Sequence, residues 1–355
     1  MLDFHIIYFL ILFFISEIIH RYSCHKRKYS PVSAGSIVMA IGIFSLAALQ
    51  KLSFENVFIT KLIALELLII WLYIAASYFI CYLKGYFFIL VQHMHDQLSI
   101  GTWVASCAVM AMVIQEEFPT WHILIWTMAL LALAIWTIYF LLLIKIFLKI
   151  LTGASRIHVG TILLSTVSTQ AIVILLNTLL PMLIPRYFNQ ILIVIGSIFY
   201  IIGLLIILRY HIIKKPKYIF IRWSNTNNII HGALSITGIA ILITHAMSKN
   251  IIILIWITVT SLFAMIESVS LIKLYQRIKK AGLLKGAFSY DVSQWSRIFT
   301  YGMYYAFSLE IFESNVFQNE LTNLIAQFGQ YVVLVILLIE IAVYFSSKFS
   351  RSGFI

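Results

Sequence analysis

Charged residues are scarce in this chain of 355 residues, where Asp, Glu, Lys and Arg together account for only 11%. A soluble protein needs a largely polar surface, and a sequence that is 62% hydrophobic cannot supply one. The composition therefore excludes a soluble globular protein and predicts an integral membrane protein. The apolar runs are continuous and do not alternate with polar residues, which also excludes an outer-membrane β-barrel.

Cysteine and proline are scarce as well. Cys24, Cys81 and Cys107 lie singly at or within apolar segments, so they form neither a CxxC pair nor a disulfide framework. With five prolines and no low-complexity run, no stretch marks a linker between domains. The sequence has no P-loop and no GxGxxG motif, so we expect no nucleotide and no other cofactor.

A metal site is also not expected. The stretch HMHD (93–96) invites a metal hypothesis, because His and Asp are common metal ligands. His93 and His95 are two positions apart, however, and would not share a face of a helix. No further cluster of ligands accompanies them.

Eleven apolar segments are long enough to cross the ~30 Å hydrocarbon core, which takes ~20 helical residues. The first has no small-residue cleavage site, and basic residues follow it, so it is not expected to be a removable signal peptide. We expect an additional span with its N-terminus outside, and an interfacial helix is the alternative. The segments are 4–20, 33–50, 60–83, 99–114, 121–147, 160–183, 190–209, 226–246, 250–273, 295–312 and 324–346.

Basic residues predict the orientation of the ten segments after residue 30. If the segments alternate in direction, 21 of the 25 Lys and Arg residues fall on one side and 4 on the other. Cytoplasmic loops collect Lys and Arg, so we expect a multi-pass protein of the cell membrane with a cytoplasmic C-terminus. The net charge of +12 then reflects loop placement, and no nucleic-acid partner is expected. The predicted organisation is an N-terminal helix with a basic loop (1–29), a ten-helix domain (30–347) and a short tail (348–355).

Small and polar residues alternate between these ten segments. We number these segments from 1 (33–50) to 10 (324–346). Gly, Ala, Ser, Thr, Asn and Gln supply 43 of 97 residues in the odd-numbered segments and 27 of 118 in the even-numbered ones. Small residues let helices approach closely, whereas helices rich in Leu and Ile can face lipid. The pattern predicts an all-α membrane protein of five helical hairpins, each with its odd helix inward. Buried packing without a lumen explains the same composition.

One stretch in each odd-numbered segment resembles the tellurite-resistance/C4-dicarboxylate transporter family, which includes the slow-type anion channels of plant guard cells. Together the five stretches follow the order of the family's inner helices and span most of residues 30–347. They are SPVSAGSIVMAIGIFSLAA (30–48), HDQLSIGTWVASCAVMA (95–111), GTILLSTVSTQAIVIL (160–175), NNIIHGALSITGIA (227–240) and YDVSQWSRIFTYGMYYAF (290–307).

The resemblance implies a fold and a function. Family members have ten helices, five of them around a central pore, and usually form homotrimers that pass small inorganic anions or carboxylates. In the family a phenylalanine of the ninth helix closes the pore, and by its position in the motif that residue is Phe299. The chain departs from the family at Phe299-Thr300-Tyr301-Gly302, where Phe-Pro-Leu-Gly is usual. Without the proline a kink is lost, which puts the geometry of the gate in doubt.

Further residues are candidates for the path itself. Hydroxyl groups could solvate a passing anion and glycines could widen the lumen, although hydroxyls that bond to their own helix and glycines at helix contacts explain them equally well. Arg297 and Glu310 are candidates for the electrostatics of the two mouths. The predicted lining residues are Gly42, Ser45, Thr102, Ser106, Ser165, Ser168, Thr169, Gly232, Ser235 and Gly302.

Four glutamates in apolar segments are candidates for a proton relay. Their depths differ and three lie on even-numbered helices, so protonated or snorkelling side chains and trimer contacts are the favoured interpretation. The four are Glu66, Glu267, Glu310 and Glu340.

Two other functions stay open. A non-conducting structural or immunity-type protein could retain this fold, and the missing proline and additional N-terminal span are consistent with one. An intramembrane lipid-modifying enzyme is disfavoured, because the cytoplasmic loops supply only Asp96 and Asp291 as acids. We therefore expect a transporter or channel and no enzyme. The sequence does not distinguish among anions, or a channel from a proton-coupled carrier.

Overall fold

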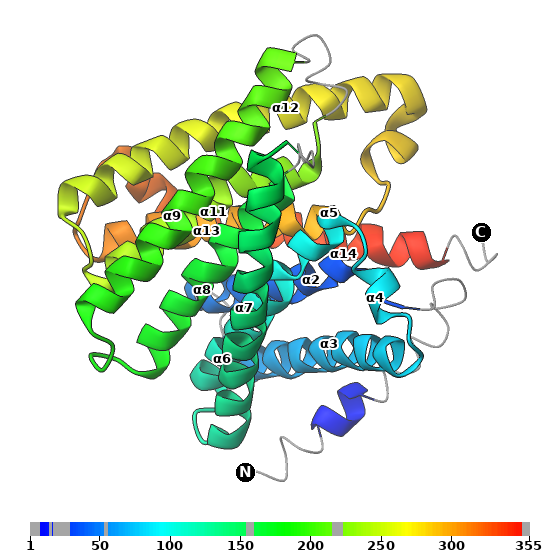
Figure 1. Ribbon diagram of the computed structural model, residues 1–355, viewed down its shortest axis with the longest axis horizontal. Helices are drawn as coiled ribbons and strands as arrows, with labels where there is room; N and C mark the ends of the chain where they lie inside the picture. The colour runs from blue at the N-terminus through cyan, green and yellow to red at the C-terminus, as the bar shows by residue number, and fades with distance from the viewer. Residues whose placement is uncertain are drawn as a thin grey trace.

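The computed structural model describes residues 8–13, 16, 29–52, 56–153, 160–214 and 223–349. Across these ranges the chain is helical and has no strand (Figure 1). Residues 8–13 are helical and lie beside α3 (Val57–Leu83), with the ring centroids of Tyr8 and Phe58 5.3 Å apart. Apart from residue 16, the remainder of the predicted span 4–20 lies outside the described residues, as do residues 350–355 of the predicted tail.

Nine helical stretches of the described chain are long and apolar enough to cross a membrane. They coincide with nine of the eleven predicted segments. The predicted segment 295–312 corresponds to α13 (Ser293–Glu313), a helix of 21 residues whose serines, tyrosines and charged residues lower its hydropathy. The nine are Val32–Lys51, Val57–Leu83, Met94–Glu117, His122–Leu151, Gly160–Leu179, Arg186–His211, Asn225–Thr244, Lys249–Leu283 and Glu320–Ser347.

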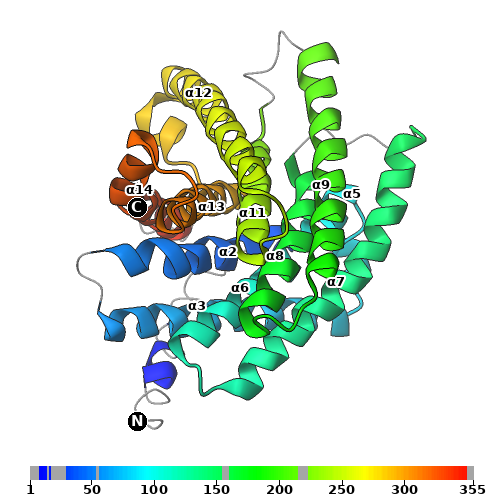
Figure 2. The same cartoon turned by 90° about the vertical axis from the view of Figure 1, so that its left-hand side faces the viewer.

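Five helices pack against one another in a closed cycle, which we call the five-helix ring. Each contacts the next in the order α2, α6, α8, α11 and α13, and α13 contacts α2 again. Figure 2 shows these helices at the centre of the molecule. The ring helices are α2 (Gly35–Ile43), α6 (Gly101–Glu117), α8 (Leu164–Leu179), α11 (Ile229–Thr244) and α13 (Ser293–Glu313).

The other long helices lie outside the ring. α3 packs on α2 and α6, α7 on α6 and α8, α9 on α8 and α11, α12 on α11 and α13, and α14 on α13. Of the most apolar window in each span, 72–89% of the residues are buried in the four ring spans, against 28–39% in the five outer ones. The helices richer in small residues are therefore the buried ones. The outer helices are α3, α7 (His122–Leu151), α9 (Arg186–Leu208), α12 (Lys249–Ala287) and α14 (Glu320–Phe349).

Short irregular elements extend several helices. A π-helical segment, η2 (Phe44–Ala48), continues α2 without a break in direction and leads into the last turn, η3 (Leu49–Lys51). A second π-helical segment continues α9, and α12 is broken at Gly282, which has φ 79°. The other short elements are η1 (Val32–Ala34), α4 (Phe87–Leu90), α5 (Met94–Ser99), η4 (Gly160–Leu163), η5 (Arg209–Lys214) and η7 (Asn225–Asn228).

Glycine permits the close approach of neighbouring ring helices. A Cβ atom at Gly42 would overlap the side chain of Val109 on α6, and one at Gly35 would meet Thr102 one helical repeat earlier. Both pairs are seven residues apart on each helix, so α2 and α6 run parallel and in register. Close approach of this kind is the usual role of small residues in helix packing within membranes.

Candidate functional site

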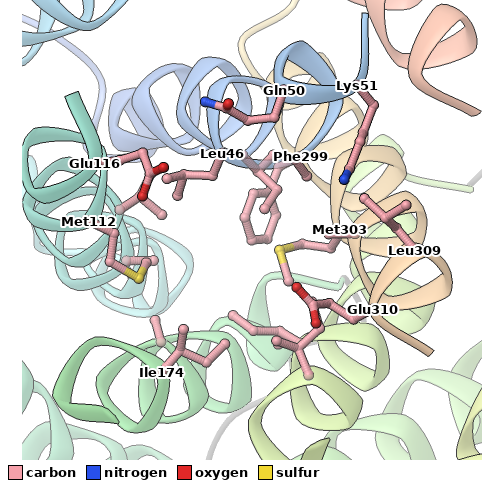
Figure 3. A pocket seen from close by; sticks show the side chains of 18 of the residues that line it. Leu46, Gln50, Lys51, Met112, Glu116, Ile174, Phe299, Met303, Leu309 and Glu310 are labelled. Atoms are coloured by element: carbon pink, nitrogen blue, oxygen red, sulfur yellow. The ribbon is translucent and has the colours of Figure 1, made fainter. Parts of the chain in front are cut away.

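A cavity of about 360 Å³ lies inside the five-helix ring, and each of the five helices supplies part of its lining (Figure 3). None of the lining residues lies in the first turn of a ring helix, and on α6 and α13 the lining reaches the last turn, which places the cavity toward the C-terminal ends of these helices. They are Ile43, Leu46, Ala47, Gln50, Lys51, Ala105, Val109, Met112, Glu116, Ala171, Ile174, Ile236, Ile239, Phe299, Met303, Ala306, Leu309, Glu310 and Glu313.

Phe299 forms part of the inner end of the cavity. It is the lining residue nearest the start of α13, its side chain is 2% exposed, and its ring projects into the cavity beside Met303 in Figure 3. On each of the other ring helices the lining residue nearest the N-terminus is also buried and apolar. This inner end, which we call the floor, consists of Ile43, Ala105, Ala171, Ile236 and Phe299.

The opposite end of the cavity is charged and exposed. Lys51 Nζ lies 2.6 Å from Glu313 Oε1, and both side chains are partly exposed. Glu116 and Glu310 line the same end from α6 and α13, on opposite sides of the cavity in Figure 3. Three carboxylates and one ammonium group therefore surround this mouth. The lining between mouth and floor is apolar, and part of it lies on the π-helical segment of α2, a feature common at functional sites.

None of the ten predicted lining residues lines this cavity. The hydroxyls of Thr102, Ser165 and Ser235 are buried and donate to carbonyl oxygens three or four residues earlier, at 2.8, 2.6 and 2.9 Å. Ser106, Ser168 and Thr169 bond to their own helices in the same way. In the absence of water these bonds satisfy the hydroxyls inside the bundle.

The other predicted lining residues lie at helix contacts. Gly42 faces Val109, Gly232 faces Thr300 on α13, and Gly302 faces Ile43, so each of these glycines is covered by a side chain of the neighbouring ring helix. Ser45 is buried within the π-helical segment. Their small size serves the packing of the ring.

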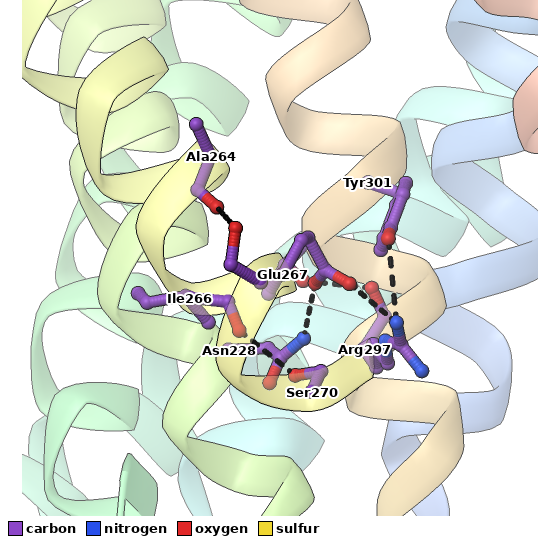
Figure 4. A network of polar contacts seen from close by, with 9 residues as sticks. Asn228, Ala264, Ile266, Glu267, Ser270, Arg297 and Tyr301 are labelled. Atoms are coloured by element: carbon purple, nitrogen blue, oxygen red, sulfur yellow. Dashed lines mark hydrogen bonds and ion pairs between the residues drawn. The ribbon is translucent and has the colours of Figure 1, made fainter. Parts of the chain in front are cut away.

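Arg297 lies on the other side of α13. Two residues along a helix correspond to a rotation of ~200°, so Arg297 points away from Phe299 and toward α12. There its guanidinium pairs with the carboxylate of Glu267 and lies 3.4 Å from the Tyr301 hydroxyl (Figure 4). Asn228 of η7 donates to the second oxygen of Glu267 at 2.6 Å. Arg297, which the sequence offered as a candidate for the electrostatics of a mouth, thus forms an ion pair between helices in the structure.

The tyrosines of α13 also serve contacts between helices. Tyr304 donates to Thr260 on α12 at 3.2 Å, and Tyr305 donates to Gln330 on α14 at 3.2 Å. Ser308, one turn after Tyr304, accepts from Trp256 of α12 at 3.0 Å. Polar bonds thus hold α13 to the outer helices on both of its flanks.

Sequence reasoning missed most of the cavity lining, although it included Phe299 and Glu310. A helical stripe from Phe299, taken at steps of three and four residues, passes through Met303, Ala306 and Glu310 and ends at Glu313. That periodicity could have found them. To predict Gln50, Lys51 and Glu116, one would have to know where the ends of the parallel helices α2 and α6 meet.

The long apolar helices define the chain as a multi-pass membrane protein. Comparison of its sequence with protein-family models and with curated proteins finds no match.

Proposed function

We propose that this protein is a membrane channel or transporter whose solute path follows the axis of the five-helix ring, with Phe299 as its barrier. The observation that carries the proposal is a cavity that all five ring helices line and that ends at this buried aromatic side chain. The proposal includes membership of the tellurite-resistance/C4-dicarboxylate transporter family, which the five motif stretches support.

The floor of the cavity has the properties of a hydrophobic gate. Ile43, Ile236 and Phe299 offer no polar group to replace the water around an ion, so an ion that passes them must lose part of its hydration shell. The bonds of α13 to α12 and α14 oppose rotation of the whole helix. Opening by rotation of the Phe299 side chain leaves those bonds intact and is the mechanism we propose.

The solute we propose is a small inorganic anion or a carboxylate, driven by its own gradient or by protons. Support comes from the resemblance and from helix direction. The lining includes no residue from the first turn of any ring helix, so we infer that the N-termini of these helices gather at the opposite end. Helix N-termini carry partial positive charge and attract anions. By the distribution of Lys and Arg, that end faces the cytoplasm.

The charged mouth favours a second candidate, a cation path. Glu116, Glu310 and Glu313 outnumber Lys51 at this end, and rings of carboxylates are typical of pores that select cations. The two candidates share the path and the barrier and differ only in the sign of the ion.

A homotrimer in the cell membrane completes the proposal, with the C-terminus in the cytoplasm and the N-terminus outside. Large apolar side chains are exposed along the outer helices, for example Ile138 of α7 and Ile201 of α9, and lipid or a second copy of the chain would cover them.

Ion flux into proteoliposomes tests the function, with Phe299→Ala as the opened variant. Phe307→Ala is the matched control, because Phe307 is a buried phenylalanine of the same helix that does not line the cavity. A flux that rises only in Phe299→Ala supports the gate, and its reversal potential in a salt gradient gives the sign of the ion. A folded Phe299→Ala protein that passes neither anions nor cations would identify a non-conducting protein.

A further inference from the structure

A second cavity, of about 420 Å³, lies at the end of the ring where α11 and α13 begin, and we call it the basic pocket. It lies between η7, the α12–α13 connection and the last turns of α12, away from the lining of the central cavity. Its lining is almost entirely polar. The lining residues are Ser224, Asn225, Lys273, Arg277, Ser289, Tyr290, Asp291, Ser293 and Gln294.

Two cations enter the basic pocket from the same face of α12. Lys273 and Arg277 are one helical turn apart, and like charges at this spacing repel each other. Lys273 donates to the carbonyl of Trp223 at 2.5 Å, and Arg277 donates to the hydroxyl of Ser289. Among the described residues neither cation forms an ion pair with a carboxylate. No carboxylate of the described residues is therefore paired directly with either cation to offset their mutual repulsion.

The acidic residue of the pocket is already engaged. The Asp291 carboxylate accepts from the backbone N–H and the hydroxyl of Ser293, the first residue of α13, at 2.8 and 2.5 Å. With Lys273 and Arg277 both charged, the lining keeps a net charge of +1 after Asp291 is counted. An anion between the two cations would therefore be favoured electrostatically.

Neutral donors complete the pocket. The Ser289 hydroxyl oxygen accepts from Arg277, which leaves the O–H of Ser289 free to donate to a ligand. The Asn225 side-chain amide donates to the Ser293 hydroxyl in a long hydrogen bond of 3.3 Å. A phosphate group presents several strong acceptor oxygens, and a guanidinium with an ammonium and a hydroxyl is a suitable donor set for it.

The position along α12 places the basic pocket at the level of lipid headgroups. Lys273 is 24 residues beyond Lys249, the first residue of the helix, which corresponds to a rise of ~36 Å. A hydrocarbon core is ~30 Å thick, so a helix that starts at one surface brings Lys273 to the other. Basic pockets between helices at this level are a known type of site for anionic headgroups.

We propose that the basic pocket binds a phosphate-bearing anion, either the headgroup of an anionic phospholipid or a free phosphate, through Lys273, Arg277 and Ser289. This site is independent of the transport path and does not rest on the proposed function.

Binding to the purified full-length protein tests the proposal in two arms. One arm titrates inorganic phosphate by calorimetry in neutral detergent. The other measures phosphatidylglycerol retained against phosphatidylcholine in native mass spectrometry. We expect wild-type binding in at least one arm, and the arm that responds identifies the source of the phosphate. The double variant Lys273→Gln/Arg277→Gln should lose at least ten-fold in that arm.

Two further variants keep the test decisive. Lys279→Gln removes one positive charge from an exposed position of α12 outside the pocket and should bind like wild type. Ser289→Ala removes one hydrogen bond at low risk to folding and should weaken binding by about five-fold. Wild-type protein that binds in neither arm would overturn the proposal. So would a double variant Lys273→Gln/Arg277→Gln whose loss of binding is no larger than that of Lys279→Gln.

Discussion

Arg297 of α13 and Glu267 of α12 form an ion pair on the side of α13 that faces away from the central cavity. Only one residue separates Arg297 from Phe299 in the sequence, yet the two side chains serve opposite faces of the helix. One side holds α13 to the outer helix, and the other forms the floor of the cavity. The polar and aromatic character of α13 follows from this double task.

Removing one partner of this pair should destabilise the protein. In Arg297→Met the carboxylate of Glu267 loses its paired cation and keeps the hydrogen bond from Asn228, and an unpaired buried charge typically costs about 3 kcal/mol. We expect a clear drop in the Tm of the purified protein, measured by light scattering or intrinsic fluorescence. The double variant Arg297→Met/Glu267→Gln should lose less than the sum of the two single variants. Strict additivity would show that the pair is not coupled.

Opening the floor of the cavity should increase flux. Phe299→Ala removes the benzyl group, so hydrated ions can cross with less loss of water, and we expect a rise of about ten-fold or more, equal to ~1.4 kcal/mol of barrier. Phe299→Trp should keep the low flux of wild type. Proteoliposome flux measures both, with Phe307→Ala as the control. A gate elsewhere would leave Phe299→Ala unchanged.

Neutralising the mouth should shift ion selectivity. Glu310→Gln removes a negative charge from the cavity and should move the reversal potential, recorded on the Phe299→Ala background, toward the anion equilibrium potential. Glu320→Gln, at the start of α14 and outside the cavity lining, should leave it in place. Equal shifts in both variants would point to a general surface effect.

Breaking the ion pair at the mouth should cost little stability. The Lys51 and Glu313 side chains are 39% and 46% exposed, and such pairs contribute between zero and about 1 kcal/mol because water and salt screen them. Lys51→Gln should therefore change the Tm far less than Arg297→Met does, although both remove one cation from an ion pair. A similar loss in both would mean that the mouth pair is shielded from solvent.

Filling a glycine contact in the ring should destabilise the bundle. In Gly42→Ala the new methyl group overlaps Val109, and crowding of a packed core costs about 1–3 kcal/mol. Val109→Ala removes the overlapping atoms, so the double variant should regain part of the lost Tm. The comparison of single and double variants by thermal unfolding tests this. A double variant less stable than both singles would contradict direct overlap.

Much of the fold could be predicted from the sequence. The apolar segments and the inner set of helices depend on local properties, namely length, hydropathy and residue size, whereas some ends differ, such as that of α12, which continues to Ala287 beyond the predicted residue 273. The alternation of small residues identified the buried helices because close backbone contact requires them wherever helices pack tightly. Gly232, for example, is small because it packs against Thr300 of the neighbouring ring helix, and this contact does not depend on a lumen.

The candidate site could be predicted only in part. Phe299 and Glu310 line the cavity, whereas the hydroxyls of Thr102 and Ser165 are bonded within their own helices. Composition indicates that a helix is inner, but it does not give the rotation of that helix about its axis. Consecutive residues of a helix point ~100° apart, so a shift of one residue in the predicted inward face moves a side chain from the cavity to a neighbouring helix.

The sequence by itself determined that this is a helical membrane protein with a buried and an exposed set of spans, because hydropathy and side-chain volume are properties of each segment alone. Only the tertiary structure decided that Arg297 meets Glu267, that Lys51 meets Glu313, and that Phe299 forms part of the floor of a cavity. These pairings depend on how helices far apart in the chain are rotated and aligned against one another, and packing of the whole bundle sets that arrangement.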